Sequence, residues 1–215
     1  MRKLLLSKWT KASLFAICLL PLAALGWRAL HHGLTANPIE FITHDTGTWT
    51  LNFLLITLGV TPIRKLLGLP DLIRFRRMFG LFAFFYGCLH FTTYIWLDKF
   101  FDLREIWKDI DKRPYITVGF LAFTMMIPLA ITSTAGWIRR LGGRQWQTLH
   151  RLIYVSAVGG VVHYYWLVKS AILVPLAYAA VLAVLLAWRV AEQFWRRSSA
   201  GREMQAKPQP QKNQA

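Results

Sequence analysis

Six long apolar stretches occupy most of this 215-residue chain and leave little room for anything else. A stretch of about 20 apolar residues crosses the hydrocarbon core of a bilayer as an α-helix. The pattern therefore predicts an all-α protein, a polytopic transmembrane bundle of six helices. The six stretches are residues 12–30, 48–67, 78–97, 115–136, 148–167 and 170–190.

Composition supports a membrane protein. Hydrophobic residues make up 55% of the chain, with 10 Trp and 14 Phe. A soluble domain has about 45–50% apolar residues even when glycine is counted. The two cysteines, Cys18 and Cys88, both fall within apolar stretches. A disulfide framework or a zinc site is therefore not expected.

The net charge of +16 is spread over short segments next to the apolar stretches, with no extended basic domain. This distribution argues against nucleic-acid binding. When alternate loops are assigned to alternate sides of a membrane, one side receives 19 basic and three acidic residues, and the other receives seven of each. Because basic residues are retained on the cytoplasmic side, both termini are expected to be cytoplasmic.

The chain divides into a cytoplasmic N-terminus (residues 1–11), a six-helix membrane domain (12–190) and a polar tail (191–215) that we expect to be disordered. The first apolar stretch also resembles a secretory signal peptide. Its apolar run continues to Leu30, however, which favours a retained helix. The outer loop 98–114 spaces its apolar residues near a helical period, so it is either a short amphipathic helix on the membrane surface or a solvated loop.

Two histidines, His90 and His163, are expected at the same depth in the membrane. Their helices run in the same direction, and each histidine lies about 20 Å along its helix at 1.5 Å per residue. An ionisable side chain in a bilayer is costly and indicates a functional site. Two imidazoles at one level can ligate one iron from opposite faces, so the pair predicts a b-type haem between helices. The alternative is that each histidine only hydrogen-bonds another helix.

Glycines precede both histidines by about one helical turn. Gly87 lies three residues before His90, while Gly159 and Gly160 lie four and three residues before His163. Residues three or four apart share a helix face, so each histidine has an adjacent turn free of side chains. Such a gap would admit a flat macrocycle. Small residues also let membrane helices pack closely, which is the alternative explanation.

The role of His150 is less constrained. It is predicted at the cytoplasmic start of the fifth helix, about 20 Å from His163 and about 140° away around the helix axis, unless the helix bends at 159–160. His150 could serve a second haem, bind a quinone or flavin, or relay protons. Its basic neighbours could pair with haem propionates or a flavin phosphate, or simply set the topology. These neighbours are Arg76, Arg77 and Arg151.

Three further histidines fall in or beside the first outer loop. We expect them to be solvated, and a metal site made from them alone is not indicated. They are His31, His32 and His44.

At these residues the chain resembles the MsrQ (YedZ) family, the haem-binding membrane subunits of bacterial periplasmic methionine sulfoxide reductase systems. More broadly it resembles the ferric reductase-like transmembrane domain shared with NADPH oxidases. The similarity covers residues 40–168, and the first and last helices match only in character. The matching segments are HDTGTWTLNF, ITLGVTPIRK, RRMFGLFAFFYGCLHFTTY, KRPYITVGF, AITST and RQWQTLHRLIYVSAVGGVVHYYW.

The resemblance implies that His90, His150 and His163 are the haem-linked histidines. The oxidase relatives hold two stacked haems with two histidines on each of two helices. Here Arg76 and Arg77 occupy the inner position of the third helix, so one haem b is expected and a second is left open. The resemblance also implies FMN binding, which no motif in this chain shows independently.

The function implied by the resemblance is electron transfer in the bacterial inner membrane. Only about 25 residues follow the last predicted helix, so electrons must come from the quinone pool or from a separate cytoplasmic flavin reductase. The acceptor implied by the resemblance is the periplasmic molybdopterin-containing reductase MsrP, which repairs oxidised methionines. One alternative is a stand-alone ferric or oxygen reductase. Another is a proton channel or transporter that uses the histidines as a relay.

Overall fold

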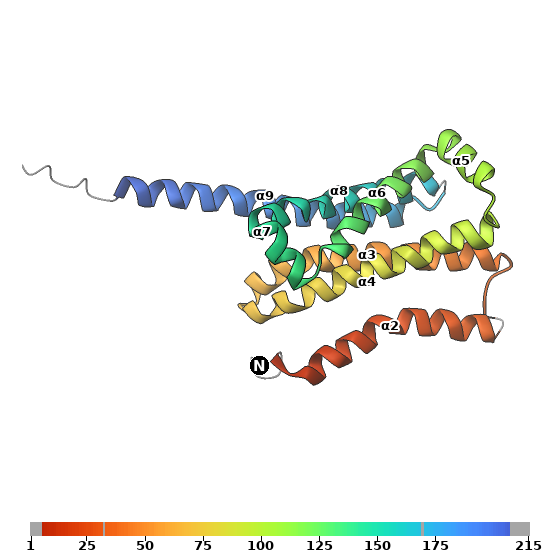
Figure 1. The fold of residues 1–215 in the computed structure, drawn as a ribbon, viewed down its shortest axis with the longest axis horizontal. Coiled ribbons are helices and arrows are strands. Elements are labelled where there is room, and N and C mark those ends of the chain that lie inside the picture. The colour runs from red at the N-terminus through yellow and green to blue at the C-terminus, as the bar shows by residue number, and fades with distance from the viewer. Residues whose placement is uncertain (1–5, 32, 169, 207–215) are drawn as a thin grey trace, which may run out of the picture.

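A computed structural model describes residues 6–31, 33–168 and 170–206 of the protein, and all regular structure within these ranges is helical. This confirms the all-α prediction. The helices are drawn in Figure 1. They are α2 (Lys8–Leu30), α3 (Pro38–Leu66), η1 (Pro70–Leu72), α4 (Ile73–Thr92), η2 (Thr93–Asp98), α5 (Leu103–Lys112), α6 (Pro114–Ile131), α7 (Ala135–Leu149), α8 (Leu152–Leu167) and α9 (Leu173–Ala206).

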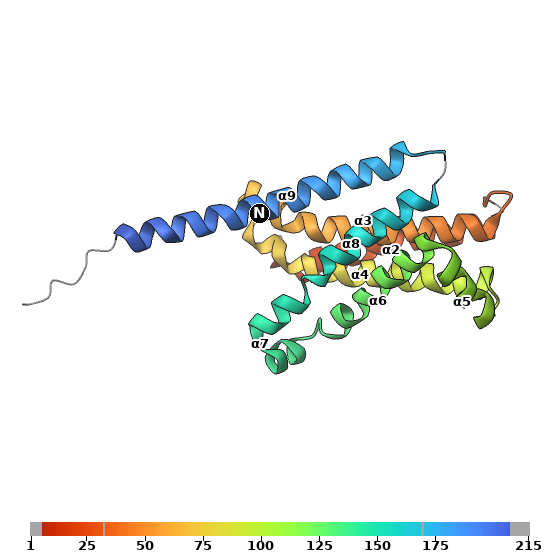
Figure 2. The same cartoon turned by 90° about the horizontal axis from the view of Figure 1, so that it is seen from above.

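The long helices lie side by side along one direction (Figures 1 and 2). The most extensive contacts join α3 to α4 and α6 to α8. The start of α2 and the far end of α9 point to the same end of the bundle, the end that also carries α7, while α5 lies at the opposite end. The two ends are called here the α7 end and the α5 end.

Four of the six predicted stretches are continuously helical apart from their ends, whereas 115–136 runs past the end of α6 at Ile131 and 148–167 begins in the last residues of α7. Judged by length and composition alone, four segments of the described chain could cross a membrane as helices. They are α2, Pro70–Asp98, α6 and the Leu173–Trp195 part of α9. Helix α8 has only 16 residues, and α3 begins with a polar segment. The count of six crossings therefore stays a prediction.

Apolar side chains cover the outward faces of these helices. In α2 only Cys18 and Leu25 are buried, although most of the helix is apolar. Trp27 is 65% exposed on α2 and Val184 is 69% exposed on α9. A helix that is apolar all round must be surrounded by apolar material, which is protein on one side and lipid on the other. The chain is a membrane protein.

Helix α3 starts ten residues before the predicted stretch, at Pro38. Asn37 caps it: the Glu40 amide donates to Asn37 Oδ1 (3.3 Å), and Asn37 Nδ2 donates back to Glu40 Oε2 (3.0 Å). Proline at the first helical position and a reciprocal cap are strong start signals for a helix. These local interactions extend α3 beyond its apolar part.

Two of the predicted loops are helical. The amphipathic alternative for 98–114 is confirmed as α5, whose N-cap Asp102 accepts the Arg104 and Glu105 amides at 2.9 and 3.2 Å. The predicted loop before His150 is instead α7, which Thr134 caps and which bends at Gly142, where φ is +72°. Helix α7 buries no residue. Its sequence is therefore polar and contains no apolar stretch from which a helix could be predicted.

Helix α9 continues beyond the predicted end of the last span. The disorder expected from residue 191 is not seen as far as Ala206, because the backbone remains helical there. Residues 191–206 include many good helix formers, such as alanine, glutamate, glutamine and arginine, which extend a helix already started by its apolar part. Residues 207–215 lie outside the described part of the chain.

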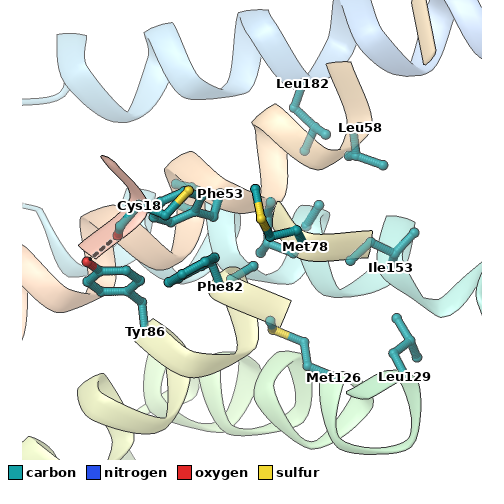
Figure 3. Close-up of a cluster of buried hydrophobic side chains, with 14 of the residues drawn as sticks. Cys18, Phe53, Leu58, Met78, Phe82, Tyr86, Met126, Leu129, Ile153 and Leu182 are labelled. Atoms are coloured by element: carbon teal, nitrogen blue, oxygen red, sulfur yellow. Dashed lines mark hydrogen bonds between the residues drawn. The ribbon is translucent and has the colours of Figure 1, made fainter. Parts of the chain in front are cut away.

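The core draws side chains from α2, α3, α4, α6, α8 and α9 (Figure 3), and within it Phe53 of α3 stacks on Phe82 and Tyr86 of α4. Tyr86 also bridges two backbone groups of α2 next to Pro21, which lies inside that helix. Its hydroxyl accepts the Leu22 amide (3.2 Å) and donates to the Cys18 carbonyl (2.9 Å). In a regular helix these two backbone groups pair with each other. Tyr86 therefore ties α2 to α4.

Candidate metal centre

The structure brings His90 and His163 together between α4 and α8. Their ring centroids are 6.1 Å apart and the ring planes cross at 75°. Two histidines 73 positions apart in sequence therefore face each other, as their predicted common depth requires.

Each of the two imidazoles is oriented by a backbone carbonyl. His90 Nδ1 lies 2.9 Å from the carbonyl oxygen of Thr43, and His163 Nδ1 lies 2.7 Å from that of Tyr115. A carbonyl oxygen can only accept a hydrogen bond, so Nδ1 carries the proton in both rings. Each Nε2 is then left with a free lone pair, which is the state of a metal-ligating histidine.

The separation of the rings fits one metal ion between them. A bond from a metal to an imidazole nitrogen is about 2 Å long, and the nitrogen lies about 1.1 Å from the centre of a five-membered ring with bonds of about 1.35 Å. Two such halves sum to about 6.2 Å, against 6.1 Å between the centroids. Among the described residues no three His, Cys, Asp or Glu side chains gather as ligands. A metal here would need its other ligands from a cofactor, and a porphyrin supplies four nitrogens.

Two glycines that the sequence did not single out lie against the rings. A Cβ on Gly47 of α3 would be 3.0 Å from both Nδ1 and Cε1 of His90. A Cβ on Gly119 of α6 would be 2.6 Å from His163 Nδ1. The second distance is too short for any real Cβ contact, so the position of the His163 ring requires glycine at residue 119.

The two histidines line a cavity of about 620 Å³ between α3, α4, α5, α6 and α8. Cofactor pockets commonly have volumes of about 300–1,000 Å³. Of the three glycines predicted to clear space, Gly87 and Gly160 line the cavity and Gly159 does not. A Cβ on Gly159 would meet Ala122 Cβ at 3.0 Å, so that glycine lets α8 approach α6.

Helix α4 changes to the wider π-helix η2 three residues after His90. The Thr93 hydroxyl donates to the His90 carbonyl oxygen (2.8 Å) and receives a hydrogen bond from the Thr43 hydroxyl (3.2 Å). Short π segments often occur at functional sites. Here the widened turn joins the backbone of His90 to the helix that supplies its carbonyl partner.

A charged network closes the α5 end of the cavity. Tyr94 and Arg113 line the cavity, and both contact the buried Asp109 of α5, through Tyr94 Oη (3.2 Å) and Arg113 Nε (3.2 Å). Lys99 Nζ lies 2.7 Å from the same carboxylate. Burial alone would raise the pKa of Asp109, but the hydrogen bond from Lys99 and the charges of Lys99 and Arg113 hold it below its ordinary value.

The outer histidines differ in position. His31 ends α2 and is exposed, as expected, and His32 lies outside the described residues. His44 departs from the expectation, because it lies within α3 and lines the cavity. The late predicted start of α3 is the reason why the sequence placed His44 in a loop.

His150 does not line the cavity among the described residues. It lies at the end of α7 and not within α8, so the chain turns at 150–151 and not at the glycine pair. Its ring stacks on Trp146, with centroids 3.8 Å apart, and Nδ1 lies 3.0 Å from the Trp146 carbonyl oxygen. Its Nε2 is buried and has no hydrogen-bond partner within the described chain.

The predicted arginines are also outside the cavity. Arg76 is half-buried, whereas Arg77 and Arg151 are exposed, and none of the three lines the cavity with His90. The basic residue that does so is Arg113, from the segment between α5 and α6.

Comparisons with known proteins identify the family of the chain. Residues 46–161 match the family described as "Ferric reductase like transmembrane component". That match includes Gly47 and Gly119, the two glycines that pack against the imidazole rings. It also includes His90 and His150, whereas His163 lies two residues beyond its end.

Several curated relatives share the name "Protein-methionine-sulfoxide reductase heme-binding subunit MsrQ". The protein from Herminiimonas arsenicoxydans is 55% identical over 187 residues, covering 86% of this chain and 84% of the relative. The protein from Azospira oryzae is 56% identical over 185 residues, covering 86% and 79%. The protein from Bordetella pertussis is 50% identical over 194 residues, covering 89% and 93%. No solved structure matches the chain.

Proposed function

This chain belongs to the MsrQ family of heme-binding subunits, within the ferric reductase-like transmembrane family, and we propose that it binds haem b and carries electrons to a methionine sulfoxide reductase. The names of the relatives supply the cofactor and the reductase. His90 and His163 would hold the iron of the haem through their Nε2 atoms.

The observation that carries the proposal is the arrangement of these two imidazoles. They face each other across 6.1 Å, and each Nδ1 is held by a backbone carbonyl. A proton relay needs neither a fixed common tautomer nor a ring separation that matches two metal–nitrogen bonds. Haem bound there would supply reversible one-electron chemistry to the site.

The surrounding residues fix the ligands before the cofactor arrives. The carbonyls of Thr43 and Tyr115 set the tautomers, and Gly47 and Gly119 let α3 and α6 close on the ring faces. Outer partners of this kind orient metal ligands and raise their basicity. Arg113, at the α5 end of the cavity, is the proposed partner of a haem propionate.

The proposed topology has six crossings of the bacterial inner membrane, with both termini in the cytoplasm. The common end of α2 and α9 in the bundle supports an even number of crossings. The excess of basic residues supports a cytoplasmic α7 end. The α5 residues that line the cavity then place it on the periplasmic side, where the proposed acceptor is a molybdopterin reductase of the MsrP type.

The proposed donor acts from the α7 end and is the quinone pool or a cytoplasmic flavin reductase, with FMN as a second cofactor. His150 lies on that side, outside the cavity, and its Nε2 has no partner within the described residues. This position supports a role in electron or proton delivery and leaves a second haem as the further option.

Haem titration of purified variants tests the proposal. His90→Ala and His163→Ala each remove one axial ligand, so each should abolish the six-coordinate Soret spectrum that the wild-type protein develops. His31→Ala, an exposed histidine on α2, is the matched control and should titrate as wild type. Wild-type protein that is folded and supplied with haem yet develops no Soret band would refute haem binding.

A further inference from the structure

Buried polar nitrogens without partners gather at the α7 end of the bundle. Within the described residues four such side-chain atoms occur, and all belong to that end. A buried polar atom left unpaired costs free energy, so native structures rarely keep several of them together. They are Arg64 Nε, His150 Nε2, Trp188 Nε1 and Arg189 Nε.

Two of these atoms belong to arginines that lie within electrostatic range of a third. Arg64 ends α3, Arg189 is part of α9, and Arg76 lies near the start of α4. Arg76 interacts electrostatically with both of the others. None of the ion pairs found among the described residues joins any of the three arginines to a carboxylate, and Glu192 of α9 pairs with Lys65.

The protein fixes the position of Arg189 without neutralising it. One terminal nitrogen donates to the Thr61 hydroxyl (3.0 Å), and the guanidinium lies over the Tyr154 ring, 5.6 Å from its centroid. These contacts orient the planar group and leave its Nε–H free. Three half-buried guanidinium groups held together without an anion repel one another, and that repulsion grows as water is excluded.

We propose that these three arginines form a binding site for a phosphate group. A phosphate carries a full negative charge or more and offers several acceptor oxygens, and the guanidinium fork matches its geometry. Bound between α3, α4 and α9, it accepts from the free Nε–H groups of Arg64 and Arg189 and neutralises Arg76. The site is separate from the histidine cavity and does not depend on haem.

The same chemistry is present in a phospholipid headgroup and in a soluble phosphate. The experiment uses the full chain in maltoside detergent micelles, which contain no phosphate group, in phosphate-free buffer, and follows the thermal midpoint. One arm adds inorganic phosphate, and the other adds phosphatidylglycerol to the micelles. At a hundredfold excess over Kd the bound ligand should raise the midpoint by roughly 5–10 °C. The arm that responds identifies the source.

Arg64→Gln and Arg189→Gln test the assignment. Each removes a charge-assisted hydrogen bond, so each should weaken binding about tenfold or more. Without ligand, Arg64→Gln should melt at or above the wild-type temperature, because a repelling charge is gone, whereas Arg189→Gln also loses the contacts with Thr61 and Tyr154. Arg139→Gln, an exposed arginine on α7, is the control and should respond as wild type.

Three results would overturn the proposal. The first is a wild-type protein that responds to neither probe, which means that water alone occupies the site. The second is an unchanged response in both arginine variants. The third is an equal loss of response in Arg139→Gln, which would indicate general attraction to basic surface.

Discussion

A single methyl group at residue 119 should weaken the proposed haem binding strongly. In Gly119→Ala the added Cβ would lie 2.6 Å from His163 Nδ1 and 3.0 Å from its Cε1 and Cγ. The contact is with a ring and not with the end of a flexible chain, so the imidazole itself must shift. That shift breaks the hydrogen bond to the Tyr115 carbonyl, which is only 2.7 Å long.

The magnitude follows from two costs. Forcing an extra methyl into a packed site costs about 1–3 kcal/mol, and a lost hydrogen bond costs about 0.5–1.5 kcal/mol. Together they come to about 1.5–4.5 kcal/mol. This is the free energy needed to hold the His163 ring in the position that haem binding requires. Haem affinity should therefore fall at least tenfold and as much as a thousandfold.

The assay is a haem titration of purified protein followed by Soret absorbance. Gly47→Ala, with its Cβ 3.0 Å from the His90 ring, should weaken binding less. Gly26→Ala is the control, because its Cβ meets nothing within 4 Å. It should titrate as wild type and stabilise α2 by about 0.5–1 kcal/mol. Wild-type haem affinity in Gly119→Ala would refute the account of the ring-packing glycines.

Three further predictions concern other parts of the molecule. Tyr86→Phe leaves both α2 backbone groups without their bridge and should cost about 1–3 kcal/mol of unfolding free energy, measured by denaturation in detergent. The pKa of Asp109 lies below its ordinary value of 3.8, so its carboxylate stabilises the fold above about pH 4. This contribution is lost as the pH falls through the lowered pKa. The difference in thermal midpoint between wild type and Asp109→Asn should therefore shrink below pH 4. His150→Ala should leave the spectrum of haem bound by His90 and His163 intact and slow its reduction by the proposed donor, a cytoplasmic flavin reductase, in stopped-flow measurements. Loss of all haem in that variant would instead place His150 in the first ligand set.

The pairing of His90 with His163 was predictable because helix rise is fixed. Apolar stretches give approximate helix starts, and 1.5 Å per residue converts sequence position into depth. The proton on each Nδ1 and the carbonyls that hold it were not predictable, because they depend on α3 and α6, which are remote in sequence. Gly47 and Gly119 were missed for the same reason: each acts on a ring of another helix.

Helix ends were predicted less well than helix centres. The Asn37–Glu40 cap was present in the sequence as a start signal for α3, and its use would have moved His44 into the helix. Helix α7 had no comparable apolar signal. Because α7 ends at Leu149, His150 lies in the turn between α7 and α8. The prediction of one regular helix from residue 150 to residue 163 was therefore wrong.

The electron paramagnetic resonance spectrum of the ferric, haem-loaded protein tests the central claim most directly, because it reports the axial ligands of the iron. Coordination by His90 and His163 predicts a low-spin, six-coordinate signal that is lost in either alanine variant and kept in His31→Ala. A high-spin, five-coordinate signal in the fully loaded wild-type protein would contradict the facing pair of histidines as the haem site.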